Sequence, residues 1–208
     1  RPERGRGSIG AMSTTLIVID MQESFRRSPE WAQVSDPGVV ARVGALVGAA
    51  RDGGHGVVWV LHANPGSGGP FDPAGGDVRL MGEFAPAPDE PVLTKTSRNA
   101  FTTTRLGQHL TASGVSEVVI CGIQTEQCCE TTARLAADLG YRVTFVTEAT
   151  ATFPIRRPDT GATLDAAAVI ERTEFALAGR FARISTADDA FASASASAQS
   201  ADARGRGR

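Results

Sequence analysis

The sequence predicts a single α/β domain, with a mostly parallel, doubly wound sheet of about six strands between two helical layers. Short runs rich in Val, Ile and Leu recur along the chain, as in strands that are buried on both faces of a sheet. Segments with helical periodicity separate these runs, and this alternation is typical of a parallel sheet. A chain of 208 residues, of which 41 % are hydrophobic, is large enough to form one such core.

The expected strands are short apolar runs, each followed by a polar residue, a turn or a helical pattern. In chain order they are Thr15–Asp20, Gly56–His62, Pro91–Lys95, Glu117–Ile123, Arg142–Thr147 and Phe181–Thr186. The first run, TLIVID, is the most hydrophobic, so we expect a buried strand there.

The expected helices occupy the intervals between these strands. They cover Pro37–Asp52, Arg105–Ser113, Glu126–Leu139 and a segment near Leu164–Ala176. Asp36 is a candidate N-cap because Pro37 suits the first helical position, and Gly140 is a candidate C-cap. The Gly- and Pro-rich segment Ala63–Asp89 is long enough to be a functional loop or lid.

The two ends of the chain differ in composition from the middle. Residues 1–11 are rich in Arg and Gly, and residues 187–208 are rich in Ala, Ser, Gly and Arg, so both offer little to bury. We expect a disordered or partly ordered N-terminal segment, one domain over residues 12–186, and a C-terminal tail.

Composition excludes several classes of protein. A net charge of −2 and a pI of about 6.0 argue against a nucleic-acid binder. No apolar run approaches the ~20 residues that span a bilayer, so no membrane partner is expected. The three cysteines lie within nine residues and form no disulfide framework, which indicates a cytoplasmic protein. No phosphate-binding loop follows a strand, so no cofactor is expected.

The chemistry-bearing residues are expected at one edge of the sheet, because open parallel sheets bind ligands beyond the carboxyl ends of their strands. The polar and thiol residues that end or follow the strands are Asp20, His62, Lys95, Gln124 to Cys128, and Glu148. These residues are therefore the first candidates for a site that binds a small-molecule substrate.

Cys128 is the candidate nucleophile. It falls in the first turn of an expected helix, where the helix dipole stabilises a thiolate and free backbone N–H groups could hold an oxyanion. A buried cysteine is also often simply a small apolar residue, and this interpretation is favoured for Cys121 in mid-strand. Cys129 is expected to pack in the core, with contact to the ligand as the alternative.

Asp20 and Lys95 complete this constellation, although each has other interpretations. Asp20 could be a general base, a metal ligand or a structural acceptor of backbone N–H groups. Lys95 could be a solvated surface residue or the cation that holds the base in place. Twenty of the 21 basic residues are arginine, and Lys95 is the single lysine.

Three segments of the chain together resemble the isochorismatase-like cysteine hydrolases, a family that includes nicotinamidase and N-carbamoylsarcosine amidohydrolase. The segments are IDMQESF (Ile19–Phe25), KTSRNAF (Lys95–Phe101) and GIQTEQCCETTARLAADLGY (Gly122–Tyr141), within a resemblance that runs from about Thr15 to Thr186. The resemblance implies the isochorismatase-like hydrolase fold and a homodimer or homotetramer.

The resemblance also implies a site. It assigns a catalytic Asp–Lys–Cys triad to Asp20, Lys95 and Cys128, and a cis peptide bond to Ile123–Gln124. It assigns an oxyanion hole to the backbone N–H groups of Gln124 and Cys128. Four residues are expected to contact the substrate, either because the family pattern includes them or because of their position in the sequence. They are Phe25, Gln22, His62 and Cys129. Further aromatic candidates for the pocket wall are Trp31, Phe71, Phe84, Phe101 and Phe153.

The implied activity is hydrolysis of a C–N bond in a small amide, carbamoyl or lactam-like substrate through a thioester. No metal is expected, because nicotinamidases of this family use several histidines after the second strand, whereas here His62 is the only one in that region. His55 and His109 lie elsewhere in the sequence. The alternatives are a vinyl ether hydrolase of the isochorismatase type, which lacks the nucleophilic cysteine, and a non-catalytic binding protein with this fold.

Overall fold

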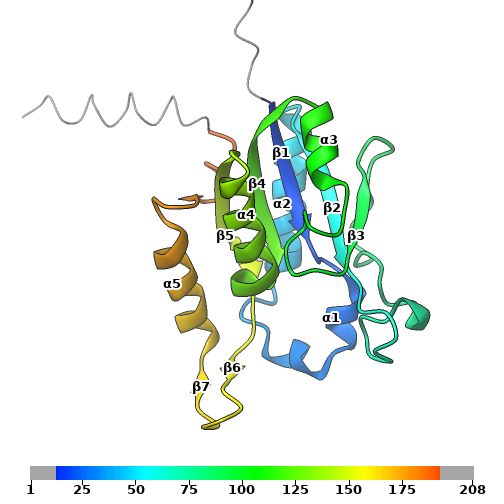
Figure 1. Ribbon diagram of the computed structural model, residues 1–208, viewed down its shortest axis with the longest axis vertical. Helices are drawn as coiled ribbons and strands as arrows, with labels where there is room; N and C mark the ends of the chain where they lie inside the picture. Colours follow the sequence, from blue (N-terminus) through cyan, green and yellow to red (C-terminus); the bar gives the residue numbers. More distant parts are fainter. Residues whose placement is uncertain (1–12, 193–208) are drawn as a thin grey trace, which may run out of the picture.

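The computed structural model describes residues 13–192 (Figure 1). The predictions for residues 1–11 and for most of the C-terminal tail, from residue 193 onward, lie outside this range. The first six residues of the predicted tail, 187–192, are described, and they pack on the domain. Ala190 is fully buried, and the Phe191 ring stacks on His55 with the ring centres 4.6 Å apart.

A six-stranded, all-parallel sheet forms the centre of the molecule, and this confirms the predicted fold class. The strands are β1 (Ser13–Ile19), β2 (Gly56–His62), β3 (Val92–Lys95), β4 (Val115–Ile123), β5 (Arg142–Ala151) and β8 (Arg183–Ile184). Their order across the sheet is β3-β2-β1-β4-β5-β8, so the chain reverses its direction of winding between β1 and β4. Ligand sites in such folds lie where this reversal occurs.

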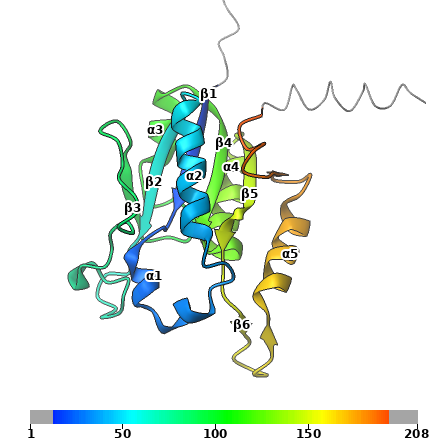
Figure 2. The same ribbon diagram turned by 180° about the vertical axis from the view of Figure 1, so that it is seen from behind.

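Helices cover both faces of the sheet. Helix α2 (Val39–Asp52) packs on one face, while α3 (Leu106–Ala112), α4 (Glu130–Asp138) and α5 (Ala166–Leu177) lie on the other (Figures 1 and 2). The strands supply both cores because alternate side chains point to opposite faces. Within residues 13–192, no helix is both long and apolar enough to cross a membrane.

Strand β1 shows how the two cores form. Leu16 and Val18 point toward α2, whereas Ile17 and Ile19 point toward the helices on the other face, and none of the four is exposed. Burying such a side chain contributes about 1.5–3 kcal/mol. The prediction that this strand is buried is therefore confirmed, and β1 pairs with β2 on one side and with β4 on the other.

Strand β5 is longer than predicted, and this corrects one candidate site residue. The strand continues past Thr147 to Ala151, so Glu148 lies within it instead of at its end. Glu148 is exposed, and its carboxylate accepts a hydrogen bond from the backbone N–H of Ala187. Glu148 therefore does not belong to the site at the carboxyl edge of the sheet.

Two predicted helix starts also differ. Helix α2 begins at Val39 because the Asp36 carboxylate accepts the Gly38 N–H at 2.8 Å, which closes a turn before the helix. The helix expected from Glu126 begins as a π-helical turn (Thr125–Cys129) that continues into α4. Cys128 thus lies within an irregular turn, of a kind that is frequent at functional sites.

Several short elements had no clear pattern in the sequence. They are α1 (Glu23–Arg27), the 3₁₀ turns Pro29–Gln33 and Pro73–Gly75, and the antiparallel pair β6 (Ile155–Arg156) and β7 (Thr163–Leu164). The pair β6 and β7 projects beyond the carboxyl edge of the sheet, on the same side as α1 (Figures 1 and 2). Elements of two to five residues are too short to show a hydrophobic period.

Gly122 allows the ends of β1 and β4 to approach each other. Its φ angle is +123°, and a Cβ atom at this position would lie 1.9 Å from the carbonyl oxygen of Ile19. Only glycine fits such a contact, because the obstructing atom belongs to the backbone and cannot turn away. The close approach places Asp20, which follows β1, beside the turn that follows β4.

We expect Gly122→Ala to destabilise the protein by about 3 kcal/mol or more, because the added methyl group forces the two central strands apart. Denaturant unfolding of the two proteins measures the loss. The control is Gly48→Ala in α2, where an added Cβ meets nothing within 4 Å and replacement of a helical glycine stabilises by roughly 0.5–1 kcal/mol. Equal stabilities of Gly122→Ala and the wild type would contradict the close approach.

Candidate active site

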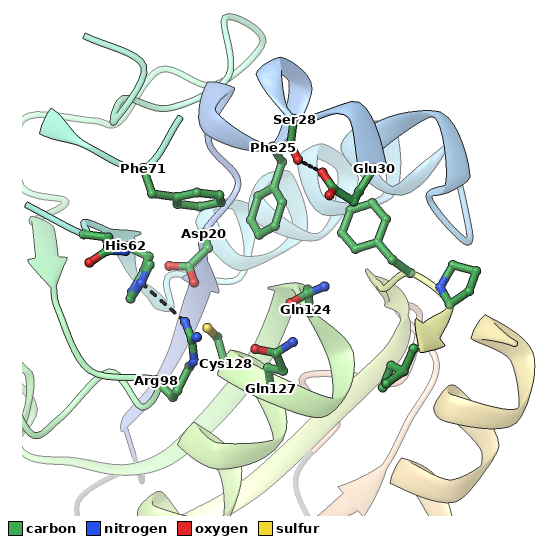
Figure 3. A pocket seen from close by; sticks show the side chains of 14 residues that line it. Asp20, Phe25, Ser28, Glu30, His62, Phe71, Arg98, Gln124, Gln127 and Cys128 are labelled. Carbon is green, nitrogen blue, oxygen red and sulfur yellow. Dashed lines mark hydrogen bonds between the residues drawn. The ribbon is translucent and has the colours of Figure 1, made fainter. Parts of the chain in front are cut away.

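A cavity of about 480 Å³ opens at the carboxyl edge of the sheet, where β1, β2 and β4 end (Figure 3). Its floor carries Asp20 and Cys128, and its walls come from loops that lie far apart in the sequence. The residues that line it are Asp20, Phe25, Ser28, Glu30, His62, Asn64, Phe71, Arg98, Gln124, Gln127, Cys128, Phe153, Pro154 and Ile155.

Asp20, Lys95 and Cys128 lie together in this region. The Lys95 Nζ atom donates to Asp20 Oδ2 at 2.9 Å and to Cys128 Sγ at 3.3 Å. Asp20 follows β1, Lys95 ends β3, and Cys128 lies in the turn after β4. Parallel strands end at the same edge of the sheet, which is why residues so distant in the sequence meet here.

Asp20 has a backbone conformation that is unusual for a residue with a side chain. Its φ angle is +52°, and its N–H donates to the Val60 carbonyl at 2.8 Å. Burial raises the pKa of its carboxyl group, although the Lys95 ammonium acts in the opposite direction. The Oδ1 atom is buried and has no hydrogen-bond partner within residues 13–192, so it is free to accept a proton or a ligand N–H.

The structure does not provide the stabilised thiolate expected at Cys128. Burial and the neighbouring Asp20 carboxylate raise the pKa of this thiol to about 12, although Lys95 lowers it. The thiol is therefore protonated at neutral pH, and a nearby acceptor has to take its proton before the sulfur becomes a strong nucleophile. Asp20 is the carboxylate in position to do so.

Gln124 occupies the junction between β4 and the π-helical turn. The Ile123–Gln124 peptide bond is cis. The Gln124 carbonyl accepts the N–H groups of Gln127 at 3.3 Å and Cys129 at 3.1 Å. The Gln124 N–H itself donates to no acceptor in the described part of the chain.

His62 contacts Lys95 as well. Its Nδ1 atom lies 3.2 Å from Lys95 Nζ, and its Nε2 atom lies 3.5 Å from Arg98 Nη1. Burial, together with the positive charges of Lys95 and Arg98, lowers the His62 pKa to about 4. His62 is therefore a neutral imidazole at physiological pH. Its side chain lines the cavity, as expected.

Gln22 and Cys129, which were expected to contact the substrate, do not line the cavity. The Gln22 side chain is fully buried and holds the main chain of His62: its Oε1 accepts the His62 N–H at 2.7 Å, and its Nε2 donates to the His62 carbonyl at 3.0 Å. Cys129 is fully buried in the core on the α4 side and does not line the cavity. Gln22 therefore positions His62, and Cys129 contributes to packing.

Aromatic rings form the apolar wall of the cavity. The Phe25 ring meets Phe71 edge-on with the ring centres 5.0 Å apart, and it stacks with Phe153 at 5.9 Å. These three of the predicted aromatic candidates line the cavity. The other three, Trp31, Phe84 and Phe101, pack elsewhere on or within the domain.

The sequence analysis did not single out several residues of the cavity wall. Arg98 lies within the KTSRNAF segment, so its proximity to Lys95 in the chain was an available signal. Gln127 and Asn64 fall within segments that the sequence indicated, the turn Gln124 to Cys128 and the loop Ala63–Asp89. No sequence pattern indicated the others, Ser28, Glu30, Pro154 and Ile155, because they come from loops that only the folded chain brings together.

The three histidines do not share a site. His62 lies at the cavity, whereas His55 and His109 line a groove at the opposite edge of the sheet, beside Thr15. In the range 13–192, no group of three or more His, Cys, Asp or Glu side chains is arranged to hold a metal ion.

The fold and the cavity together define an α/β protein with a small-molecule site at the carboxyl edge of a parallel sheet. Comparison with protein-family models identifies the class more closely: the model described as the isochorismatase domain matches residues 14–198. The chain belongs to the isochorismatase family of hydrolases, which includes amidohydrolases.

Individual relatives support this assignment. The chain is 37 % identical over 170 residues to streptothricin hydrolase from Streptomyces noursei, a match that covers 78 % of this chain and only 58 % of that longer protein. It is 27 % identical to ureidoacrylate amidohydrolase from Variovorax paradoxus, over 88 % of this chain and 81 % of the relative. The crystal structure of a putative hydrolase of the isochorismatase family from Chromobacterium violaceum superposes with a TM-score of 0.79 at 26 % identity, over 91 % of this chain and 96 % of the other.

We expect His62 to make stability depend on pH between about 6.5 and 4. Because its pKa falls from 6.5 to about 4 on folding, the unfolded chain takes up a proton first, and stability falls as the pH falls through this window. At pH 4, protonation of His62 lowers the free energy of unfolding by an amount on the order of 3 kcal/mol. Urea unfolding at fixed ionic strength measures it, with His62→Gln as the variant that cannot titrate. Identical pH slopes for the two proteins would contradict the neutral imidazole.

Proposed function

We propose that this protein is a cysteine hydrolase that cleaves a C–N bond of a small amide, carbamoyl or lactam-like substrate through a thioester. One observation carries the proposal: a carboxylate, an ammonium and a thiol meet at the floor of a cavity that is large enough for a small molecule. The proposal assigns the nucleophile to Cys128, the general base to Asp20, and the cation that organises them to Lys95.

The first step is attack on the carbonyl carbon of the substrate. Asp20 takes the thiol proton, and the sulfur forms a bond to the carbonyl carbon, whose oxygen becomes an oxyanion. The raised pKa of Asp20 supports this role, because a base whose pKa is closer to neutrality accepts a thiol proton more readily. Lys95 stabilises the charge at both Asp20 and the sulfur, since its ammonium contacts both.

The oxyanion is held by backbone N–H groups in this proposal. The Gln124 N–H, which lacks an acceptor within the described residues, supports the assignment to Gln124 and Cys128. Loss of one such donor typically costs ~3–4 kcal/mol of transition-state stabilisation.

Three proton transfers complete the cycle. Asp20 returns its proton to the leaving nitrogen as the C–N bond breaks, which leaves an acyl group on Cys128. Asp20 then takes a proton from water, whose oxygen attacks the thioester carbon, and the sulfur leaves with that proton. The products are an amine or ammonia and a carboxylic acid.

The substrate class has two supports. The names of the two curated relatives describe hydrolysis, and one of them is an amidohydrolase. The cavity combines the wall of Phe25, Phe71 and Phe153 with polar groups around the thiol, which suits a compact substrate with one flat apolar face.

The same proposal includes a cytoplasmic location and a homodimer or homotetramer. All three cysteines are free and buried, which suits a reducing compartment. The oligomeric state follows from the family resemblance, and light scattering of the purified protein tests it.

Cys128→Ala and Asp20→Asn should each lower kcat for ammonia release by roughly a thousandfold or more, because each removes a group that forms or breaks a bond. An ammonia-release screen over small amides, carbamoyl compounds and lactams measures this loss. The matched control is Cys129→Ala, which deletes the neighbouring thiol outside the cavity and should retain activity. Turnover that survives in Cys128→Ala would rule out the thioester route.

Lys95→Arg should also lower kcat, by about 100-fold or more. The guanidinium keeps the charge, but its planar fork is too wide to contact Asp20 and Cys128 from the present position of the ammonium. Circular dichroism and thermal melting distinguish this loss from unfolding. Activity close to that of the wild type would show that only the charge of residue 95 matters.

A further inference from the structure

His62 and Arg98 form one polar end of the cavity, and the proposed reaction uses neither side chain directly. The two side chains lie next to each other. Glu30 lies at the other end of the cavity, beyond Phe25 (Figure 3). The hydrogen-bonding roles of His62 and Arg98 follow from the groups around them.

Only one tautomer of His62 is compatible with the buried ammonium of Lys95 beside it. The Lys95 ammonium carries N–H groups and no lone pair, so it can only donate to His62 Nδ1, which lies 3.2 Å away. A neutral imidazole with an acceptor at Nδ1 carries its hydrogen on Nε2. The other tautomer would direct an N–H at an ammonium with no exposed surface, which cannot turn to solvent.

This tautomer leaves two donors facing each other. Arg98 Nη1 lies 3.5 Å from His62 Nε2, and a guanidinium has no acceptor atom. Neither group therefore satisfies the other. The Ser97 main chain raises the His62 pKa slightly, as an acceptor near a ring N–H does, but it does not compensate the charge of Arg98.

Arg98 forms no direct ion pair with a carboxylate among residues 13–192. Its charge lowers the pKa of Asp20 in the same cavity, but that carboxylate is already paired with Lys95. An exposed guanidinium beside an imidazole N–H, both lining one cavity, is an arrangement that carboxylate oxygens satisfy well.

We propose that His62 and Arg98 form a subsite for a carboxylate on the substrate, so the preferred substrates are amides that also carry an acidic group. The inference rests on the proposed function and makes its substrate class narrower. Lys95 contacts both His62 Nδ1 and Cys128 Sγ, so the subsite at His62 Nε2 is separated from the thiol by the Lys95 ammonium and the width of one imidazole ring. The acidic group must then lie only a few covalent bonds from the scissile carbonyl. Glu30 at the far end disfavours the opposite orientation by charge repulsion.

The test compares acidic amides with their neutral methyl esters. Malonamate, succinamate and glutaramate differ in the length of the spacer between amide and carboxylate, and each ester has nearly the same shape as its acid. We expect wild-type kcat/KM to favour at least one acid over its ester. In Arg98→Gln this ratio should fall about 10- to 100-fold, mainly through a higher KM for the acid.

Two further variants separate charge from geometry. Arg98→Lys keeps the charge but loses the planar fork, so it should recover only part of the preference. Arg105→Gln removes an equally exposed arginine that does not line the cavity, and it should leave the ratio unchanged. An equal ratio in wild type and Arg98→Gln for all three spacers would overturn the subsite, even if neutral amides are hydrolysed.

A binding measurement separates the subsite from the proposed chemistry. Titration calorimetry of the Cys128→Ala protein with succinamate, malonamate and glutaramate should show saturable binding that Arg98→Gln weakens about 10-fold or more in the same background. Binding that depends on Arg98 without turnover of any amide by the wild type would support the subsite and contradict the hydrolase. Absence of Arg98-dependent binding for all three acids would overturn the subsite.

Discussion

The structure of the site depends on the buried ion pair between Lys95 and Asp20. Both side chains are almost completely removed from solvent, and their atoms are 2.9 Å apart. Moving two such charges out of water costs several kcal/mol for each ion, and their attraction offsets this only if the geometry and the remaining hydrogen bonds are good. Lys95 meets that condition by donating to Asp20, His62 and Cys128 together. A pair of this kind contributes little net stability, so its presence at the floor of a cavity fits a chemical role.

Contacts within the surrounding fold fix the position of this ion pair. Gly122 lets β4 pass against the Ile19 carbonyl, which places the turn that carries Cys128 beside Asp20. Gln22 fixes the main chain of His62 through both of its amide atoms, and His62 in turn contacts Lys95. Behind the turn, Glu130 is buried and binds Arg134 of α4 and Arg172 of α5. The contacts of Gly122, Gln22 and Arg172 join segments that are distant in the sequence, so the positions of Asp20, Lys95 and Cys128 depend on the whole sheet.

Much of the fold could be predicted because its signals are local. The apolar runs of β1, β2 and β4 are long enough to show that both of their faces are buried, and the order of elements implies a parallel sheet. The site could be located because parallel strands end at one edge, so Asp20, Lys95 and Cys128 had to be neighbours if all three strands lie in the sheet. The end of β5 could not be predicted, because its pairing with β4 shifts register after Phe145 and resumes only at Thr150, beyond the point where the apolar pattern is interrupted.

The sequence by itself determined the fold class and the edge of the sheet at which Asp20, Lys95 and Cys128 meet. The single lysine among twenty arginines drew attention to position 95, where a compact ammonium contacts both the carboxylate and the thiol. Only the tertiary structure decided that Gln22 positions His62, that Cys129 packs in the core, and that Arg98 and His62 lie side by side at one end of the cavity. It also decided that the Cys128 thiol is protonated. The physical reason is the same in each case: side-chain direction, burial and electrostatic environment arise from contacts between distant segments, which no local pattern records.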